Sequence, residues 1–137
     1  MQVNVYLHFD GQCRAAFQFY EKALGARTGP MTTYGNSPAA GQVSPDLRDK
    51  IMHATLTVGD QIIMGSDAPH EHARPPEGFE VSLSVTDPAE AEKLFNGLSE
   101  NARVIVMPMQ QTFWSAKFGM LVDQFGIPWM VNCTQAA

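Results

Sequence analysis

The sequence has few cysteines, few basic residues and no long apolar run, and each shortage excludes a class of protein. Its 137 residues include 9 Lys and Arg against 14 Asp and Glu, a net charge of −5. The basic residues form no run, so the electrostatic footprint of a nucleic-acid-binding protein is absent. No apolar stretch approaches the roughly 20 residues that span a bilayer. The first four residues lack the basic start and apolar core of a secretory signal, and we therefore expect a cytoplasmic protein.

The two cysteines, Cys13 and Cys133, have no CxxC spacing and can form one disulfide at most. Because a cytoplasmic chain keeps its thiols reduced, we interpret both as small buried apolar residues. With 45% hydrophobic and 17% charged residues, the chain has room for one compact core of ordinary domain size. We therefore expect a single domain over residues 1–137.

The first half of the chain changes from a strand pattern to a helix pattern. Apolar and polar residues alternate over residues 3–9, which predicts a half-buried strand that Asp10 ends. An apolar stripe with helical spacing follows, and Gly25 ends the predicted helix. The stripe consists of Cys13, Ala16, Phe17, Tyr20 and Leu24. We expect a loop over residues 29–45 after this helix, because the segment contains glycine and proline.

The second half repeats this order from Phe79. Residues 79–85 alternate as the first strand does. Asp87, Pro88 and Glu90 then supply the N-cap, the first-turn proline and the capping-box carboxylate of a second helix. Its apolar stripe consists of Ala91, Leu94, Phe95 and Leu98. The strand, the helix and the residues that follow the helix are separated by nearly the same number of residues in both halves. The chain is therefore internally repeated.

Short strands follow each predicted helix. In the first half, the apolar runs 51–58 and 61–66 are separated by Gly59-Asp60, which predicts a tight hairpin. In the second half, strands are predicted over 104–107, 119–123 and 129–133, the last two joined by a turn at 124–126. Each half is therefore a strand, a helix and two or three further strands.

The polar sides of these strands form a candidate ligand site. A helix needs an apolar sheet face to lie on, so the polar face of each sheet must point elsewhere. If the two sheets curl toward each other, the polar faces line a shared cavity. The predicted wall consists of Asn4, Tyr6, His8, His53, Thr55, Thr57, Met64, Ser66, Glu80, Ser82, Ser84, Met130 and Asn132. The alternative is that both faces are simply solvated, as one face of an antiparallel sheet often is.

Four short motifs lie within the repeated plan: FYEKALGA at 19–26, IMHA at 51–54, TFW at 112–114 and DQFG at 123–126. Together they resemble the vicinal oxygen chelate superfamily, specifically its PhnB-like group. The resemblance implies an α+β fold of two tandem βαβββ modules, 1–70 and 77–135, which form an open cup-shaped mixed β-sheet with the helices on its outer face. It also implies a homodimer. The superfamily includes glyoxalase I, extradiol dioxygenases, fosfomycin resistance enzymes and bleomycin-sequestering proteins.

The resemblance also implies positions for a metal. Metal-dependent members place His and Glu ligands on the first and last strand of each module, and those places fall here on Asn4, Met64, Glu80 and Met130. Only Glu80 is a good ligand for a divalent cation, so we expect neither metal nor cofactor. A different site built from His8, His53 and Glu80 stays open. Some PhnB-like members carry the name demethylubiquinone methyltransferase, but this sequence has no glycine-rich loop of the kind a usual methyl-donor site needs.

Two wall residues are candidates for catalysis. His53 lies on the predicted cavity face and suits proton transfer or hydrogen bonding, although a structural histidine is an equal alternative. Glu80 interrupts a strand of Val, Leu and Ser and can act as a base if it is enclosed. Its alternative is an exposed strand end beside Gly78.

The candidate ligand-binding residues are Tyr6, His8, Met64, Ser66, Phe113, Trp114 and Met130. Phe113 and Trp114 can cap a cavity mouth or lie in a dimer interface. The sequence His70-Glu71-His72 resembles a metal pair, but it lies among prolines in a loop, where we expect a solvated surface.

Two functions remain open. In the first, the chain is a PhnB-like protein that binds a small molecule in its β-cup without the usual divalent metal. In the second, it is a lyase, isomerase or transferase acting on a small oxygen-rich substrate with Glu80 or His53 as base. The depleted ligand set favours the first.

Overall fold

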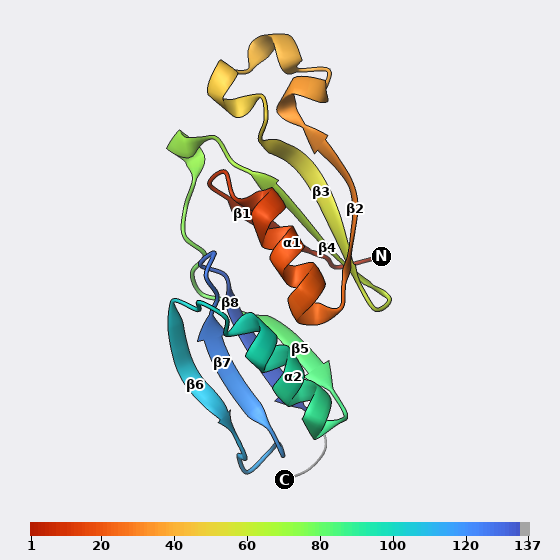
Figure 1. The fold of residues 1–137 in the computed structure, drawn as a ribbon, viewed down its shortest axis with the longest axis vertical. Coiled ribbons are helices and arrows are strands. Elements are labelled where there is room, and N and C mark those ends of the chain that lie inside the picture. The colour runs from red at the N-terminus through yellow and green to blue at the C-terminus, as the bar shows by residue number, and fades with distance from the viewer. Residues whose placement is uncertain (135–137) are drawn as a thin grey trace. The chain divides into compact units, whose positions relative to one another are not determined.

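The computed structural model describes residues 1–134 and divides the chain into two compact units, Met1–Arg74 and Pro75–Ala137. Each unit contains one four-stranded mixed sheet and one α-helix (Figure 1). We call them module one and module two. Each has the βαβββ order that the sequence predicts, which confirms the α+β class. Neither α-helix is long and apolar enough to cross a membrane within the part of the chain that the structure describes.

Module one contains five regular elements. They are β1 (Val5–Phe9), α1 (Cys13–Leu24), β2 (Arg27–Thr33), β3 (Ile51–Val58) and β4 (Gln61–Asp67). The strand order is β1-β4-β3-β2, with β1 parallel to β4 and the other pairs antiparallel. Short 3₁₀ turns connect β2 to β3 and follow β4. They are η1 (Tyr34–Asn36), η2 (Ala40–Gln42), η3 (Pro45–Leu47) and η4 (His70–His72).

The helix α1 begins and ends near the predicted residues and packs on one face of this sheet. All five residues of the predicted stripe are buried, and Gly25 ends the helix with a left-handed φ of 63°. The burial of Leu7 and Phe9 confirms the apolar face of β1. Val3 is 92% exposed and precedes β1, so the prediction of a half-buried strand that begins at residue 3 is wrong at this end.

The sheet extends further than the sequence pattern predicts. Residues 29–33 continue β2, so the predicted loop begins too early. The error arises because β2 is an edge strand with a register shift between Thr28 and Met31, where a proline is tolerated. Gly29 is required there because a β-carbon would lie 2.5 Å from Thr55 Oγ1 on the neighbouring strand.

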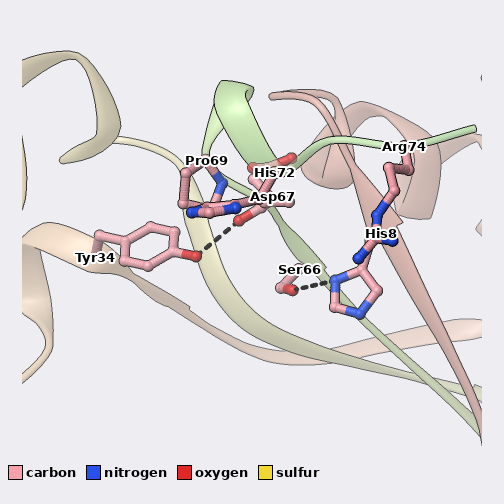
Figure 2. A pocket seen from close by; sticks show the side chains of 8 residues that line it. His8, Tyr34, Ser66, Asp67, Pro69, His72 and Arg74 are labelled. Atoms are coloured by element: carbon pink, nitrogen blue, oxygen red, sulfur yellow. Dashed lines mark hydrogen bonds between the residues drawn. The ribbon is translucent and has the colours of Figure 1, made fainter.

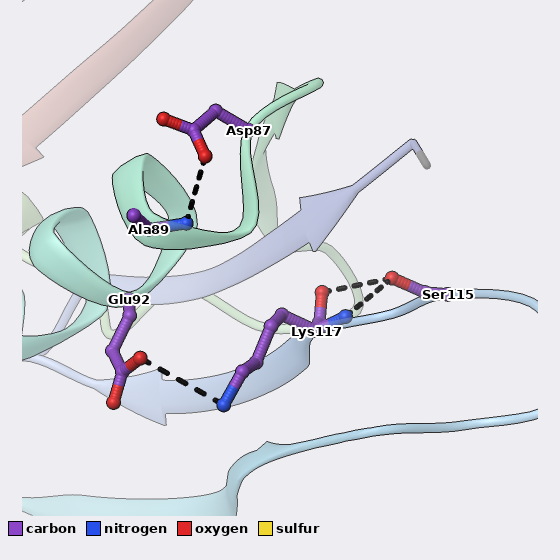
Figure 3. A network of polar contacts seen from close by, with 5 residues as sticks. All are labelled: Asp87, Ala89, Glu92, Ser115 and Lys117. Carbon is purple, nitrogen blue, oxygen red and sulfur yellow. Dashed lines mark hydrogen bonds and ion pairs between the residues drawn. The ribbon is translucent and has the colours of Figure 1, made fainter. Parts of the chain in front are cut away.

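Module two repeats the topology of module one. Its elements are β5 (Val81–Val85), α2 (Pro88–Leu98), β6 (Val104–Gln110), β7 (Phe118–Val122) and β8 (Pro128–Cys133). The strand order is β5-β8-β7-β6, and β5 and β8 are parallel. The Asp87 carboxylate accepts a hydrogen bond of 3.0 Å from Ala89 N, which confirms the predicted N-cap (Figure 3). Phe79 precedes β5 and is exposed, so it does not extend the apolar face as expected.

Polar contacts attach the segment before β7 to the rest of module two. Ser115 is fully buried, and its hydroxyl lies 2.8 Å from Lys117 O and 2.6 Å from Cys133 O at the end of β8. The Lys117 ammonium lies 3.7 Å from the Glu92 carboxylate on α2 (Figure 3). Phe113 and Trp114 therefore lie directly before residues that polar contacts fix to the rest of module two.

Glycine at position 65 determines how closely α1 approaches its sheet. A β-carbon there would lie 2.8 Å from Phe17 Cζ, on the same face as the neighbouring Leu7. A β-carbon on Gly119 in β7 would likewise lie 2.7 Å from Cε2 of the Phe95 ring on α2. A glycine in the centre of each sheet thus allows an aromatic side chain of the helix to lie directly on the strand backbone.

We expect Gly65→Ala to lower the free energy of unfolding by about 1–3 kcal/mol, because the added methyl group overpacks a filled core. Gly41→Ala is the matched control, since a β-carbon at Gly41 has nothing within 4 Å, and it should change stability by less than about 0.5 kcal/mol. Denaturant unfolding of both variants measures the difference. Equal stability of the two variants would contradict the packing described above.

Candidate functional site

Module one contains an open cavity of about 450 Å³ at the carboxyl ends of β1 and β4 (Figure 2). Its lining residues are His8, Tyr34, Ser66, Asp67, Ala68, Pro69, His72 and Arg74. Since β1 and β4 are parallel, their ends meet at one edge of the sheet, and the segment that follows β4 passes over this edge. A volume of this size suits part of a small organic molecule.

The cavity is built around the buried side chain of Asp67, which is 1% exposed. One carboxylate oxygen accepts a hydrogen bond of 2.9 Å from Cys13 N at the start of α1, and the other accepts one of 2.8 Å from Ile51 N at the start of β3. The Tyr34 hydroxyl donates a hydrogen bond of 2.7 Å to the carbonyl oxygen of Asp67 (Figure 2). Four segments of module one are therefore joined at this residue.

Two groups beside Asp67 are kept in their neutral forms. Burial, assisted by the negative charge of Asp67, raises the pKa of the Cys13 thiol from 9.0 to about 12. Burial also raises the pKa of the Tyr34 hydroxyl, again with a contribution from Asp67. Cys13 is therefore a structural thiol rather than a nucleophile at neutral pH, because a thiol reacts through its thiolate.

Three aromatic rings lie next to the cavity on the face of the sheet that points away from α1. The Tyr6 hydroxyl and His53 Nδ1 are 3.2 Å apart and share a hydrogen bond. The ring centroids of Tyr6 and His8 are 5.0 Å apart. His8 Nδ1 in turn lies 3.5 Å from the Ser66 hydroxyl. His8 and Ser66 belong to both features and connect the aromatic group to the cavity.

Strand register brings five predicted site residues together in module one. Tyr6 is opposite Met64, and His8 is opposite Ser66. Thr55 on β3 is opposite Met64, which places His53 two residues away on the same face. This confirms the predicted polar face of module one.

The four predicted site residues of module two are more scattered. Met130 on β8 is opposite Ser82 and Met120. The exposed Phe113 and Trp114 rings pack edge to face. The ring centroids of Trp114 and Phe118 are 5.3 Å apart. Glu80 precedes β5 and is exposed, close to Gly78 with its φ of 79°. This position matches the exposed strand end that was the alternative interpretation for Glu80.

Six of the eight cavity residues were missed in the sequence analysis: Tyr34, Asp67, Ala68, Pro69, His72 and Arg74. The 70–72 segment is exposed as expected, and His70 forms an ion pair of 3.0 Å with Asp10, yet His72 also lines the cavity. One signal for His72 and Arg74 was available, because a segment that directly follows the end of a buried strand must cross that edge of the sheet. Tyr34 gave no such signal, since only the folded chain brings it to Asp67.

The residues at the inherited metal positions do not suit a divalent cation. The Asn4 amide donates a hydrogen bond of 3.3 Å to Ile62 O. Met64 and Met130 offer only soft thioethers, and Glu80 is a single carboxylate. Residues 1–134 contain no group of three or more His, Cys, Asp or Glu side chains placed to hold a metal ion. We therefore derive no metal-dependent step for this chain.

Comparison with known proteins agrees with this fold. A family model described as 3-demethylubiquinone-9 3-methyltransferase matches residues 1–132. Protein YjdN from Escherichia coli (strain K12) is 33% identical over 142 residues, which cover 96% of this chain and 95% of that protein. The crystal structure of protein PA1353 from Pseudomonas aeruginosa is 44% identical with a TM-score of 0.88, covering 98% of each chain. The PhnB protein from Bacillus cereus is 23% identical with a TM-score of 0.78, covering 97% of this chain and 99% of that chain.

The two modules have the fold of the vicinal oxygen chelate superfamily, which glyoxalase-like and fosfomycin resistance proteins share at identities under 25%. The chain belongs to the PhnB-like family, whose model is described as 3-demethylubiquinone-9 3-methyltransferase. The resemblance found in the sequence motifs is thereby confirmed.

The family description implies a methyl donor, but the helix-entry turns do not suit one of the usual kind. Three residues, Asp10, Gly11 and Gln12, connect β1 to α1, and Thr86 and Asp87 connect β5 to α2. These turns contain one glycine between them, whereas the usual donor site has a glycine-rich loop between a strand and a helix of a parallel sheet. We derive no methyl-transfer step from these residues.

Proposed function

We propose that the chain is a small-molecule binding protein whose ligand lies on the polar sheet face of module one and extends into its cavity. One observation carries this proposal: the aromatic group of Tyr6, His8 and His53 meets the cavity at His8, within one module. The flat ring of Tyr6 and the adaptable side chain of Met64 supply apolar surface. His8 and Ser66 supply hydrogen bonds. This division of an apolar platform and a few polar groups is typical of small-molecule sites.

Module two, considered by itself, has exposed aromatic side chains. Phe113 is 93% exposed and Trp114 is 48% exposed, and Met130 lies on the face of its sheet that points away from α2. Large exposed apolar side chains that adjoin one another are typical of a surface that a ligand or another chain covers. We propose that Phe113, Trp114 and Met130 provide module two with an apolar binding surface of its own.

A second candidate function is an enzyme of the lyase, isomerase or transferase type acting on a small oxygen-rich substrate. The hydrogen bond between Tyr6 and His53 favours it, because a histidine oriented by a neighbouring hydroxyl can accept a substrate proton. Glu80 is the other candidate base, and its exposure next to β5 leaves it accessible. In this alternative, His53→Gln or Glu80→Gln removes turnover and leaves binding of the substrate largely intact.

The binding proposal is tested with compounds from a metabolite library that raise the melting temperature of the protein. We expect such a compound to bind His8→Gln at least fivefold more weakly than the unchanged protein, because His8 joins the platform to the cavity. His70→Gln is the control, since His70 is an exposed histidine of the same module that does not line the cavity. The affinity of the His70→Gln variant for the compound should stay within twofold of that of the unchanged protein. Equal affinity of the folded His8→Gln variant would place the site elsewhere.

The exposed edge of module two supports the homodimer that the sequence predicts. Strand β6 lies at the edge of its sheet, and Val104, Ile105 and Val106 on it are 43% to 56% exposed. An open apolar edge strand associates with other chains unless a partner covers it. We propose that β6 of two copies lie in a symmetric interface.

Light scattering at micromolar concentration should give twice the 15.0 kDa chain mass. Val106→Lys should shift the protein to the monomer, because a charge at the centre of the interface cannot be desolvated cheaply. A monomeric unchanged protein, or a Val106→Lys variant that stays fully dimeric, would refute this interface.

A further inference from the structure

The accessible charge of the module-one cavity differs in sign from that of the protein as a whole. The chain has a net charge of −5, yet Arg74 and two imidazoles, His8 and His72, line the cavity. Figure 2 shows the Arg74 side chain extending along the wall toward His8. A cationic wall in an acidic protein raises the local concentration of anions and lowers that of cations.

The single carboxylate among the lining residues is not directed at a ligand. Both oxygens of Asp67 accept backbone hydrogen bonds, from Cys13 N and Ile51 N, and the side chain is buried. The nearby Asp10 is paired with His70 at 3.0 Å and does not line the cavity. Hydrogen-bond donors and one permanent positive charge therefore dominate the accessible wall.

The other two polar lining groups, Tyr34 and Ser66, are neutral and do not repel an anion. Tyr34 donates its hydrogen to Asp67 O and stays protonated, because burial raises its pKa. The Ser66 hydroxyl lies beside His8 Nδ1, and it can donate its hydrogen to a ligand oxygen when Nδ1 carries a hydrogen and donates to Ser66 Oγ. Arginine is the side chain best suited to hold a carboxylate or a phosphate, because its planar guanidinium can donate two parallel hydrogen bonds.

We propose that this cavity binds the carboxylate or phosphate group of a small molecule, with Arg74 as the charged anchor and His8 and His72 as further donors. The inference rests on the proposed small-molecule function and names its ligand class. His8 is also 5.0 Å from the Tyr6 ring, so the rest of the ligand lies over Tyr6 and His53. The ligand therefore combines an anionic end with a flat apolar part.

Benzoate and phenyl phosphate are the anionic probes, and benzyl alcohol is the neutral one. Titration of the ¹⁵N-labelled protein at low ionic strength, where exposed charges are least screened, reports both affinity and position. We expect both anions to shift the amide signals of His8 and of residues 66–74, and to bind at least tenfold more tightly than benzyl alcohol. The ratio of the two anionic affinities shows which oxyanion the cavity prefers.

Arg74→Gln should weaken the binding of both anions at least fivefold. Arg27→Gln removes the same charge at the opposite end of the sheet, where Arg27 pairs with Thr57, and should leave affinity within twofold. Unchanged anion affinity in Arg74→Gln, or benzyl alcohol binding as tightly as the anions, overturns the inference and leaves a small-molecule site in place. Absence of shifts at the cavity with all three probes also overturns it. The proposed function fails separately, if the library compounds do not bind module one.

Discussion

The buried carboxylate of Asp67 is the interaction on which the candidate site depends. It holds the first amide of α1 and the first amide of β3 at the end of β4, three segments that are far apart in the sequence. A hydrogen bond to a charged group contributes about 1.5–3 kcal/mol, and loss of this acceptor would leave two N–H groups without their partner. Tyr34 is attached to the same residue, because its hydroxyl donates a hydrogen bond to the backbone carbonyl oxygen of Asp67. The cavity wall is thus fixed by a residue that contributes little exposed surface to it.

The two modules share a topology and differ in the residues that stabilise it. Phe9 and Asp67 end the parallel strand pair of module one, whereas Val85 and Cys133 end that of module two. In module two the corresponding end is held by Ser115, which donates to Cys133 O. Its buried aspartate is Asp123, which accepts hydrogen bonds from Ile127 N and from the Trp129 indole. The cavity of module one therefore depends on an aspartate, Asp67, at a register position where module two has Cys133.

The sequence predicts the sheet faces well because alternation is a local property. The pattern around Tyr6, His8 and Ser66 identifies the polar face, and the stripe of α1 identifies the opposite one. Local patterns fail where pairing across the sheet decides the outcome. Residues 29–33 join β2 despite a glycine and a proline, because an edge strand needs only one partner.

Within the candidate site, the strand residues were the most predictable. Ser66 and His8 follow from register, and Arg74 lies in the segment that must cross the sheet edge after β4, whereas Tyr34 reaches the cavity only after the chain has folded around Asp67. Glu80 shows the opposite error. It continues an alternating pattern, yet β5 begins one residue later, so periodicity placed it in a strand that the hydrogen bonds do not include.

The role of Asp67 is tested most directly by amide hydrogen exchange in an Asp67→Asn variant. An asparagine side chain retains one acceptor oxygen and presents an NH₂ group in place of the other, so it cannot accept from both amides. We expect exchange of the Cys13 and Ile51 amides to accelerate at least tenfold, while the Val131 amide in the centre of module two changes little. Unchanged protection of both Cys13 and Ile51 would show that the carboxylate does not hold these segments together and that the cavity has another structural basis.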